Sequence, residues 1–370
     1  MESNFIYDRP VSGRSHLGRK AEAEALAGLL SSGGSAAIYE PSKSGKTSLV
    51  RQAIFDMKVS GIAVSAVEVS LLSTRSLSEM AAVMQAAMRK AFPDFFAGAA
   101  GGFVAGPAGG SGASVSAEEA VREAFSLPFI VAQARGHRIV VVLDEFQNAC
   151  LAGDGHTDGA KLVSDTIKKA TPEQRALCSW VFCGSQVNAM KNIFEYGRAF
   201  THLCSRLRLS PLGVDELTEH IVKGLLSGGK IIDKARVRSI CLELGCSAWY
   251  LNHFAAICDS LTRGYVLEPV VEQALDTLLA VHEPRFVAAV SDLTDFQVQF
   301  LRAVLDGCER FSSAEAIARY GFNSSANVRR IKDALCKKEI LTFEAGDKAV
   351  ILDPLFEFWL KNRFFLENCK

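Results

Sequence analysis

At 370 residues, the chain is too long for one ordinary hydrophobic core, and two or three domains are expected. Hydrophobic residues make up 49% of it, and 41 basic residues balance 41 acidic ones. This composition indicates a folded protein and argues against a broadly basic nucleic-acid-binding surface, although not against a local basic face.

The ten cysteines favour a cytoplasmic location, because they have no C-x-x-C spacing and lie mainly in apolar runs typical of reduced thiols. The N-terminus has no basic stretch followed by an apolar one, so no secretory signal is predicted. Residues 91–114 are interrupted by glycine and proline too often for a membrane-spanning helix, and no membrane contact is expected.

The first expected element is a turn and an amphipathic helix over residues 14–31. The turn contains Gly18 and Arg19 and precedes an apolar strand. If it packs beside a phosphate-binding loop, it can hold an adenine ring, chiefly through backbone contacts. The alternative is a purely structural helix that leads into the strand.

Residues 35–50 predict a phosphate-binding loop. A buried strand ends at Tyr39, a tight loop runs from Glu40 to Gly45, and a helix begins at Lys46. Backbone N–H groups of the loop and the positive end of the helix dipole form an anion site. Lys46 would reach the β- and γ-phosphates, and the Thr47 hydroxyl would bind Mg²⁺. The residues predicted to contact nucleotide here are Pro41, Ser42, Lys43, Ser44, Gly45, Lys46, Thr47 and Ser48.

Glu40 stands where the pattern G-x-x-x-x-G-K-[ST] has its first glycine. That glycine mainly serves the turn out of the strand, and Pro41 presets the next φ angle. Gly45, which lets the backbone approach phosphate closely, is present. A carboxylate near the mouth of the loop is expected to weaken nucleotide binding without abolishing it. A chance Gly-Lys-Thr after a strand is the alternative.

The next segments predict a strand over 61–70 and a helix over 76–91, whose methionine-rich face is typical of core packing. A Gly-rich insertion over 92–116 is expected to be flexible. It is interpreted as a disordered connection, and a mobile lid is the less favoured alternative. A helix follows at about 117–135.

Residues 138–150 provide the second anchor of the predicted site. Five consecutive apolar residues indicate a strand buried on both faces, as in a parallel sheet. Two carboxylates at its C-terminal end lie where open α/β sheets bind ligands. Asp144 would hold the Mg²⁺ shell, and Glu145 would orient and polarise the attacking water. A solvated strand end is the alternative.

A further buried strand over 179–186 ends in Ser185 and Gln186, which could contact the γ-phosphate or the water. Residues 206–211 predict a fifth, short strand. Arg198 and Arg206 are candidates to neutralise charge in the transition state, within the chain or across a subunit contact, and Arg198 is preferred. Either could equally be an ordinary surface arginine.

Residues 215–281 are helical in pattern, and the segment after 283 predicts three helices followed by two short strands at 340–344 and 348–352. This is a winged-helix pattern. Its third helix carries Arg329, Arg330 and Lys332, so insertion into the major groove of DNA is one interpretation. A protein-interaction or packing module is the other.

With these motifs in order, the chain resembles the archaeal-type ATPases, a prokaryotic P-loop group within the AAA+ and signal-transduction ATPase assemblage, over residues 5–365. The segments that carry the resemblance are Leu17-Gly18-Arg19-Lys20-Ala21-Glu22, Pro41-Ser42-Lys43-Ser44-Gly45-Lys46-Thr47-Ser48-Leu49, Asp144-Glu145-Phe146-Gln147, Gly184-Ser185, Glu283-Pro284-Arg285-Phe286 and Asp353-Pro354-Leu355-Phe356-Glu357-Phe358-Trp359-Leu360. The last two lie outside the general P-loop pattern and tie the C-terminal part to this family.

The resemblance implies a parallel sheet of order 5-1-4-3-2, with Mg-ATP surrounded by Lys46, Thr47, Asp144, Glu145 and Ser185. Two departures matter. Glu40 replaces the first glycine of the loop, and residues 245–248 lack the proline of the family's Gly-x-Pro turn. The missing proline argues against nucleotide-driven closure of the lid more than against nucleotide binding.

We therefore expect an α/β P-loop NTPase core over residues 1–211, a helical lid over 212–282 and a winged-helix domain over 283–370. The expected function is that of an ATP-binding, slowly ATP-hydrolysing regulatory ATPase of AAA+/STAND type. Glu145, Lys46, Ser185 and Arg198 are its predicted catalytic residues. Its expected ligands are ATP or ADP and Mg²⁺. Its expected protein partner is unidentified, and the sequence leaves open whether the protein forms an oligomer. The alternatives are a nucleotide-binding scaffold without hydrolysis and a winged-helix regulator that binds DNA.

Overall fold

The computed structural model describes residues 4–98, 116–152 and 158–367. By its contacts the chain separates into two compact units, which we describe one at a time. The core unit comprises residues 11–40 and 46–209. The C-terminal unit comprises residues 210–367, the N-terminal residues 4–10 and the five-residue loop 41–45.

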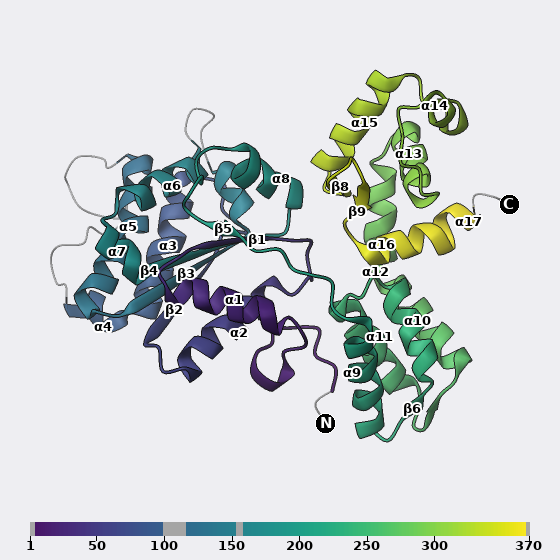
Figure 1. Cartoon of the computed structure of the whole chain (residues 1–370), viewed down its shortest axis with the longest axis horizontal. Helices are drawn as coiled ribbons and strands as arrows, with labels where there is room; N and C mark the ends of the chain where they lie inside the picture. The colour runs from purple at the N-terminus through teal and green to yellow at the C-terminus, as the bar shows by residue number, and fades with distance from the viewer. Residues whose placement is uncertain (1–3, 99–115, 153–157, 368–370) are drawn as a thin grey trace. The chain divides into compact units, whose positions relative to one another are not determined.

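A parallel five-stranded sheet organises the core unit (Figure 1). Its strands are β1 (Ala36–Tyr39), β2 (Val64–Ser70), β3 (Arg138–Asp144), β4 (Cys178–Gly184) and β5 (Ser205–Arg206). Their spatial order is β2-β3-β4-β1-β5, and every pair is parallel. All residues of β1 and β4 are buried, as in a sheet covered on both faces. The expected order 5-1-4-3-2 is confirmed.

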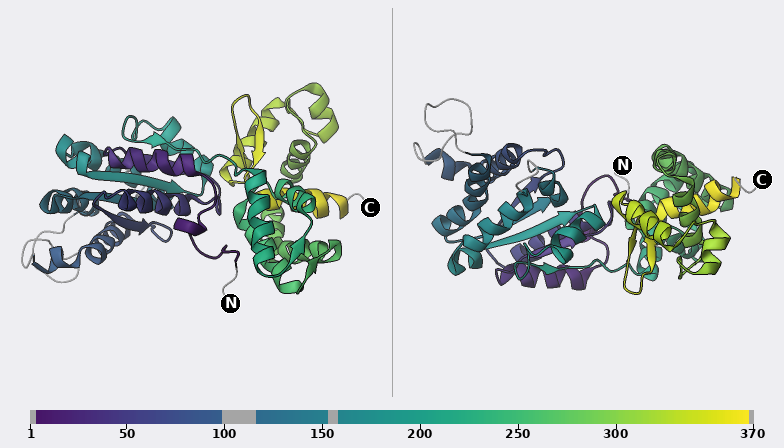
Figure 2. Two further views of the ribbon diagram at one scale, coloured as in Figure 1. Left: turned by 60° about the horizontal axis from the view of Figure 1, so that its bottom comes forward. Right: turned by 90° about the horizontal axis from the view of Figure 1, so that it is seen from above.

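Helices cover both faces of this sheet. Alternate strand residues such as Ile38, Val142 and Val181 pack with α1 (Lys20–Ser31) and α2 (Lys46–Val59) in one core cluster. Trp180 and Phe182 point to the opposite face, where Trp180 contacts Phe125 of α5 (Ala117–Arg135) and Phe182 contacts Phe146. The right-hand view of Figure 2 shows the strands between the purple helix α1 and blue helices on the other side.

The other helical segments of the core unit are α3 (Leu77–Ala91), α4 (Pro93–Gly98), α6 (Gly159–Lys169), α7 (Pro172–Leu177), α8 (Val187–Lys191), the short 3-10 helices η1 (Gly13–Ser15) and η2 (Phe146–Cys150), and the π-helical turn η3 (Asn192–Tyr196). The predicted flexible insertion 92–116 begins with Phe92, which is buried, and with helix α4. Residues 99–115 lie outside the described part of the chain.

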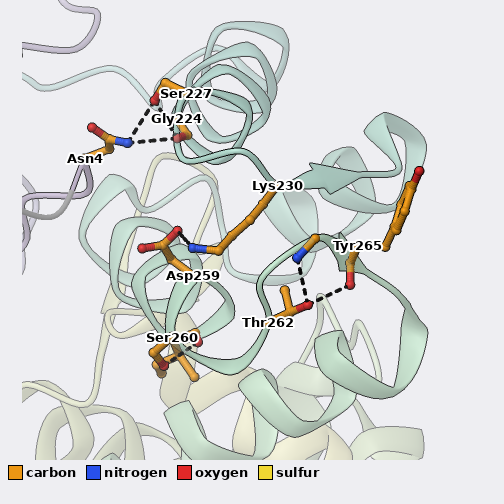
Figure 3. A network of polar contacts seen from close by, with 10 residues as sticks. Asn4, Gly224, Ser227, Lys230, Asp259, Ser260, Thr262 and Tyr265 are labelled. Carbon is orange, nitrogen blue, oxygen red and sulfur yellow. Dashed lines mark hydrogen bonds and ion pairs between the residues drawn. The ribbon is translucent and has the colours of Figure 1, made fainter.

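The first half of the C-terminal unit is helical. It contains α9 (Val214–Ser227), α10 (Lys234–Glu243), α11 (Ala248–Leu261) and α12 (Glu268–Ser291), with a small parallel ribbon of β6 (Ile231–Ile232) and β7 (Tyr265–Val266). The N-terminal segment is tied to these helices. Figure 3 shows Asn4 reaching α9, where its amide donates to the carbonyl of Gly224 (3.0 Å) and to the hydroxyl of Ser227 (2.8 Å). In the same view Lys230, just after α9, forms an ion pair with Asp259 of α11.

The second half is a winged helix. It consists of α13 (Asp295–Leu305), α14 (Ala314–Tyr320), α15 (Ser325–Lys337), the hairpin β8 (Leu341–Phe343) and β9 (Ala349–Ile351), and a C-terminal helical run of α16 (Pro354–Trp359), η4 (Leu360–Phe364) and α17 (Phe365–Glu367). Three helices followed by a hairpin is the arrangement predicted from the sequence. Helix α12, however, runs without a break through residue 283, where the sequence suggested a domain boundary.

Two sequence motifs of this unit pair with each other. On α12, Glu283 accepts a hydrogen bond from the indole Nε1 of Trp359 (2.8 Å), and Arg285 forms an ion pair with Asp353 (2.8 Å). Phe286 packs against Trp359, with ring centroids 5.6 Å apart. Asp353 also caps α16, and a proline follows it at the first helical position. The motifs therefore join α12 to α16.

In the part of the chain that the structure describes, no helix combines the length and the apolar character needed to cross a membrane.

Candidate functional site

The predicted phosphate loop connects β1 to α2. Gly45 has φ 94° and Lys43 has φ 66°, both in the left-handed region that favours glycine. Helix α2 starts directly after Gly45, so its first N–H groups lie at the end of the loop. Lys46 therefore opens the helix, as the sequence predicts for a nucleotide-binding loop.

Lys46 is held inside the core unit. Its side chain is buried, with the residue only 7% exposed, and its Nζ donates to the carbonyl oxygen of Glu40 (2.7 Å). Burial lowers the pKa of Lys46, while the neighbouring Cys183, Glu145 and Asp144 act to raise it. A buried ammonium that faces carboxylates is suited to neutralise an anion.

Asp144 ends β3 and Glu145 follows it, at the C-terminal edge of the sheet. Burial raises the pKa of Asp144, and the charge of Glu145 raises it further. The Glu145 carboxylate accepts hydrogen bonds from Ser185 Oγ (2.6 Å) and from Gln147 Nε2. Glu145 precedes the turn η2 and has a left-handed backbone, with φ 53°. The structure thus brings Glu145 and Ser185 together, and it adds Gln147, for which the sequence pattern predicts no role.

The residues present fit a hydrated magnesium ion. Among residues 4–98, 116–152 and 158–367, no group of three or more His, Cys, Asp or Glu side chains could hold a metal by itself. Mg²⁺ in nucleotide sites usually takes one or two protein ligands, and phosphates and water provide the others. A divalent cation would also relieve the charge repulsion between Asp144 and Glu145. Thr47 at the start of α2 and Asp144 remain the predicted ligands.

The Glu40 carboxylate is involved in packing inside the core unit. Its Oε1 accepts a hydrogen bond from the backbone N–H of Leu209 (3.3 Å). Burial raises the pKa of Glu40, whereas Arg206, Lys46 and Arg19 act to lower it. The side chain therefore fastens the segment after β5 to the end of β1.

Gly18 and Arg19 form a left-handed turn before α1, with φ values of 64° and 54°. The Arg19 guanidinium has buried Nε and Nη1 atoms that lack a hydrogen-bond partner among the described residues. Burial lowers the pKa of Arg19, and the charges of Glu22 and Glu40 oppose this effect. Buried donors of this kind need an acceptor, which a bound molecule or water would supply.

The two candidate arginines lie in different environments. Arg198 follows η3 and is exposed. Arg206 of β5 forms an ion pair with Glu195 and lies over the ring of Tyr39, 4.2 Å from its centroid. The Tyr39 hydroxyl also donates to Glu195 (2.8 Å). Arg206 thus contributes to the packing beside β1, and sequence spacing gave no sign of this cluster.

On the third helix of the winged-helix domain, α15, Arg329 and Arg330 are exposed. Lys332 pairs with Asp347 at the tip of the hairpin, and its Nζ lies 4.7 Å from the ring centroid of Phe343. Its side chain is 16% exposed. Lys332 therefore attaches the hairpin to α15.

The turn between α10 and α11 contains Gly245 and Cys246, which have φ values of 61° and 52°. A Cβ atom on Gly245 would lie 2.6 Å from Cβ of Pro354, so this glycine allows the N-terminus of α16 to approach closely. The turn is well defined although it lacks the expected proline.

A separate groove of about 770 Å³ lies along β6, β7 and the start of α10. Tyr265 and Leu267 are exposed there, at 65% and 63%. The nearby Arg236 forms ion pairs with Glu243 and Glu268.

Comparisons with known proteins agree with this fold. Residues 284–362 match the family model described as a probable winged helix domain. The structure is similar to the Walker-type ATPase PABY2304 of Pyrococcus abyssi, with a TM-score of 0.70 and 15% identity, covering 96% of this chain and 99% of that one. Among curated proteins, no sequence match is found.

Two forms of the ORC2 protein of Aeropyrum pernix are also similar. The ADP form has a TM-score of 0.59 at 14% identity and covers 96% of this chain and 94% of that one. The ADPNP-ADP complexes have a TM-score of 0.52 at 15% identity and cover 99% and 98%. At these identities the likeness establishes the fold. The chain has the fold of Walker-type ATPases with a C-terminal winged-helix domain.

Proposed function

We propose that this protein binds Mg-ATP at the loop between β1 and α2, hydrolyses it slowly, and thereby controls the interactions of its winged-helix domain. The observation that carries the proposal is the buried ammonium of Lys46. It opens a helix after a phosphate-type loop, and Asp144 and Glu145 are its carboxylate neighbours. Such an arrangement is suited to bind phosphate and a divalent cation together.

Each residue has a role in this proposal. Lys46 releases the carbonyl of Glu40 and binds the β- and γ-phosphates. Thr47 and Asp144 would hold Mg²⁺, which would supply positive charge beside the phosphates. Glu145 orients the attacking water, and Ser185 fixes the rotamer of Glu145 through their 2.6 Å hydrogen bond. The exposed Arg198 is available to neutralise transition-state charge, including across a subunit contact.

Two observations support the proposal that the ligand is a nucleotide: the phosphate-type loop and the similarity to solved structures. The similar ORC2 protein of Aeropyrum pernix is described in ADP and ADPNP-ADP complexes. Gly18 and Arg19 are proposed to contact the base, because the buried Arg19 donors lack a partner among the described residues. The other loop residues, Pro41 to Gly45 and Ser48, complete the proposed contacts.

The experiment is equilibrium binding and single-turnover hydrolysis of Mg-ATP by the wild type, Lys46→Ala and Glu145→Gln. We expect Lys46→Ala to lose binding and Glu145→Gln to bind without turnover. Binding by wild type and Glu145→Gln with hydrolysis by neither would support a nucleotide-binding scaffold instead. Turnover unchanged in Glu145→Gln would refute its role as the base. Absence of binding by the wild type would refute the proposal as a whole.

DNA binding through α15 is a second candidate, which the exposed Arg329 and Arg330 favour. An ORC1 protein of Aeropyrum pernix, similar at a TM-score of 0.50, is described in complex with DNA. Lys332 is a weaker candidate for contact, because its ammonium already pairs with Asp347. Binding to duplex DNA that falls with salt and is lost in the Arg329→Ala, Arg330→Ala double variant would support this function.

A further inference from the structure

The C-terminal unit contains a cluster of aromatic rings around Trp249, at the start of α11. Trp249 contacts Tyr250, His253 and His282 edge-on, with ring centroids 5.1–5.5 Å apart. Tyr7 of the N-terminal segment stacks on His253 at 4.4 Å. We call these five residues the aromatic cluster.

Lys43 of the phosphate loop places its ammonium on this cluster. Its Nζ lies 3.7 Å from the ring centroid of Trp249 and 5.5 Å from that of Tyr250. The first distance is well within the range of a cation–π interaction. The residue as a whole is exposed, so the ring face is the feature that fixes its ammonium.

The position of Lys43 is unusual for its residue type. With φ 66°, it adopts a left-handed conformation that side chains other than glycine, asparagine and aspartate rarely take. The pKa of Lys43 is lowered to about 8, chiefly by desolvation and also by the charge of Arg285, while Asp353 acts to raise it. The histidines of the cluster are neutral neighbours, because burial and the charge of Lys43 lower their pKa values.

The cluster continues into the winged-helix domain through Tyr250. The Tyr250 hydroxyl donates to Asp353 (2.8 Å) and accepts a hydrogen bond from Arg285 (2.6 Å). Asp353 in turn caps α16. A continuous chain of contacts therefore runs from a residue of the phosphate loop to a helix of the winged-helix domain.

We infer that the Lys43 ammonium exchanges between Trp249 and the phosphates of bound nucleotide, so that the aromatic cluster reports nucleotide occupancy to Asp353. This inference rests on the proposed function and specifies its regulation. A charge-assisted hydrogen bond to phosphate is stronger than a cation–π contact at an exposed site, so nucleotide wins the competition. Loss of the cation changes the environment of Trp249 and Tyr250, and with it the bond to Asp353.

The exchange predicts that removing the aromatic ring of Trp249 raises the affinity for ATP. In Trp249→Leu the competing ring face is absent, so ATP binds more tightly than to the wild type, by about two- to fivefold for an exposed cation–π contact. Lys43→Met loses the phosphate contact and binds more weakly. Damage to the fold cannot raise affinity, so the gain in Trp249→Leu separates exchange from a structural role.

The test combines ATP binding by equilibrium dialysis with the tryptophan emission of the full-length protein. The contribution of Trp249 is the difference between wild type and Trp249→Phe. We expect it to change at the ATP concentration that saturates binding, and to be insensitive to ATP in Lys43→Met. Lys43→Arg should retain the response. The control Lys332→Met removes a different cation–π contact of the same unit and should respond as the wild type does.

A second readout follows the link to α16. Hydrogen exchange at the N-terminus of α16 should change with ATP in the wild type and not in Tyr250→Phe. Three outcomes would each overturn the exchange and leave the proposed function intact. They are ATP binding without a change in Trp249 emission, a wild-type emission response in Lys43→Met, and weaker ATP binding by Trp249→Leu. No ATP binding by the wild type would remove both.

Discussion

Replacing Asp353 with alanine is expected to lower the free energy of unfolding of the C-terminal unit by about 3 kcal/mol. The Asp353 Oδ1 atom accepts hydrogen bonds from the N–H groups of Leu355 (3.0 Å) and Phe356 (3.3 Å), and loss of such a cap costs about 1 kcal/mol. The partly exposed ion pair with Arg285 adds about 0.5–1 kcal/mol. Loss of the hydrogen bond from the buried Tyr250 hydroxyl adds about 1–1.5 kcal/mol.

The measurement is native-state hydrogen exchange of α12 and α16, which reports opening of this unit separately from the core unit. Asp353→Asn keeps an oxygen that can cap the helix and should lose less stability than Asp353→Ala. Asp292→Ala, at an exposed residue after α12, is the matched control and should stay within about 0.5 kcal/mol of the wild type. If Asp353→Ala exchanges like that control, the paired motifs do not stabilise this unit.

Three further predictions concern the core unit. Burial raises the pKa of Glu40 above its ordinary value of 4.5, so ionisation of this carboxyl group destabilises the folded state as the pH rises from 4.5 through the raised pKa. Glu40→Gln should therefore have a higher Tm than the wild type near neutral pH. The difference in Tm should shrink as the pH is lowered towards 4.5. Ser185→Ala should leave ATP affinity unchanged and slow single-turnover hydrolysis about tenfold, because one charge-assisted hydrogen bond to Glu145 is lost. Hydrolysis at the wild-type rate in Ser185→Ala would contradict this role. Arg206→Ala should lower the Tm, whereas Arg198→Ala should leave the Tm unchanged and slow turnover; a stable, slow Arg206→Ala variant would reverse their assignments.

Much of the fold could be predicted from the sequence, because the decisive signals were local. The apolar runs before Glu40, through Val140 and through Val181 predict buried parallel strands, and the structure confirms them. The strand order came from family resemblance and not from these patterns, since pairing between distant strands leaves little trace in one sequence. The fifth strand proved shorter than expected, with only Ser205 and Arg206 in the sheet.

The site was less predictable than the fold. Spacing alone placed Lys46, Asp144 and Glu145 near the same sheet edge, because parallel strands end together there. Spacing could not show that the Glu40 side chain bonds to Leu209, since that contact joins residues 169 positions apart. The same limit hid the role of Arg206, which depends on a tyrosine from another strand.

Helix α12 has a consequence for how such proteins can be recombined. Its 24 residues span about 36 Å. His282 and Arg285 contact Tyr250 of α11, and Glu283 and Phe286 contact Trp359 of α16. A chimera joined at residue 283 would cut a continuous helix and place Tyr250 of one relative against Arg285 and Asp353 of another. The helical part and the winged helix would therefore have to be exchanged between relatives as one piece from about residue 210 onwards, together with residues 4–10 and 41–45 of the same unit.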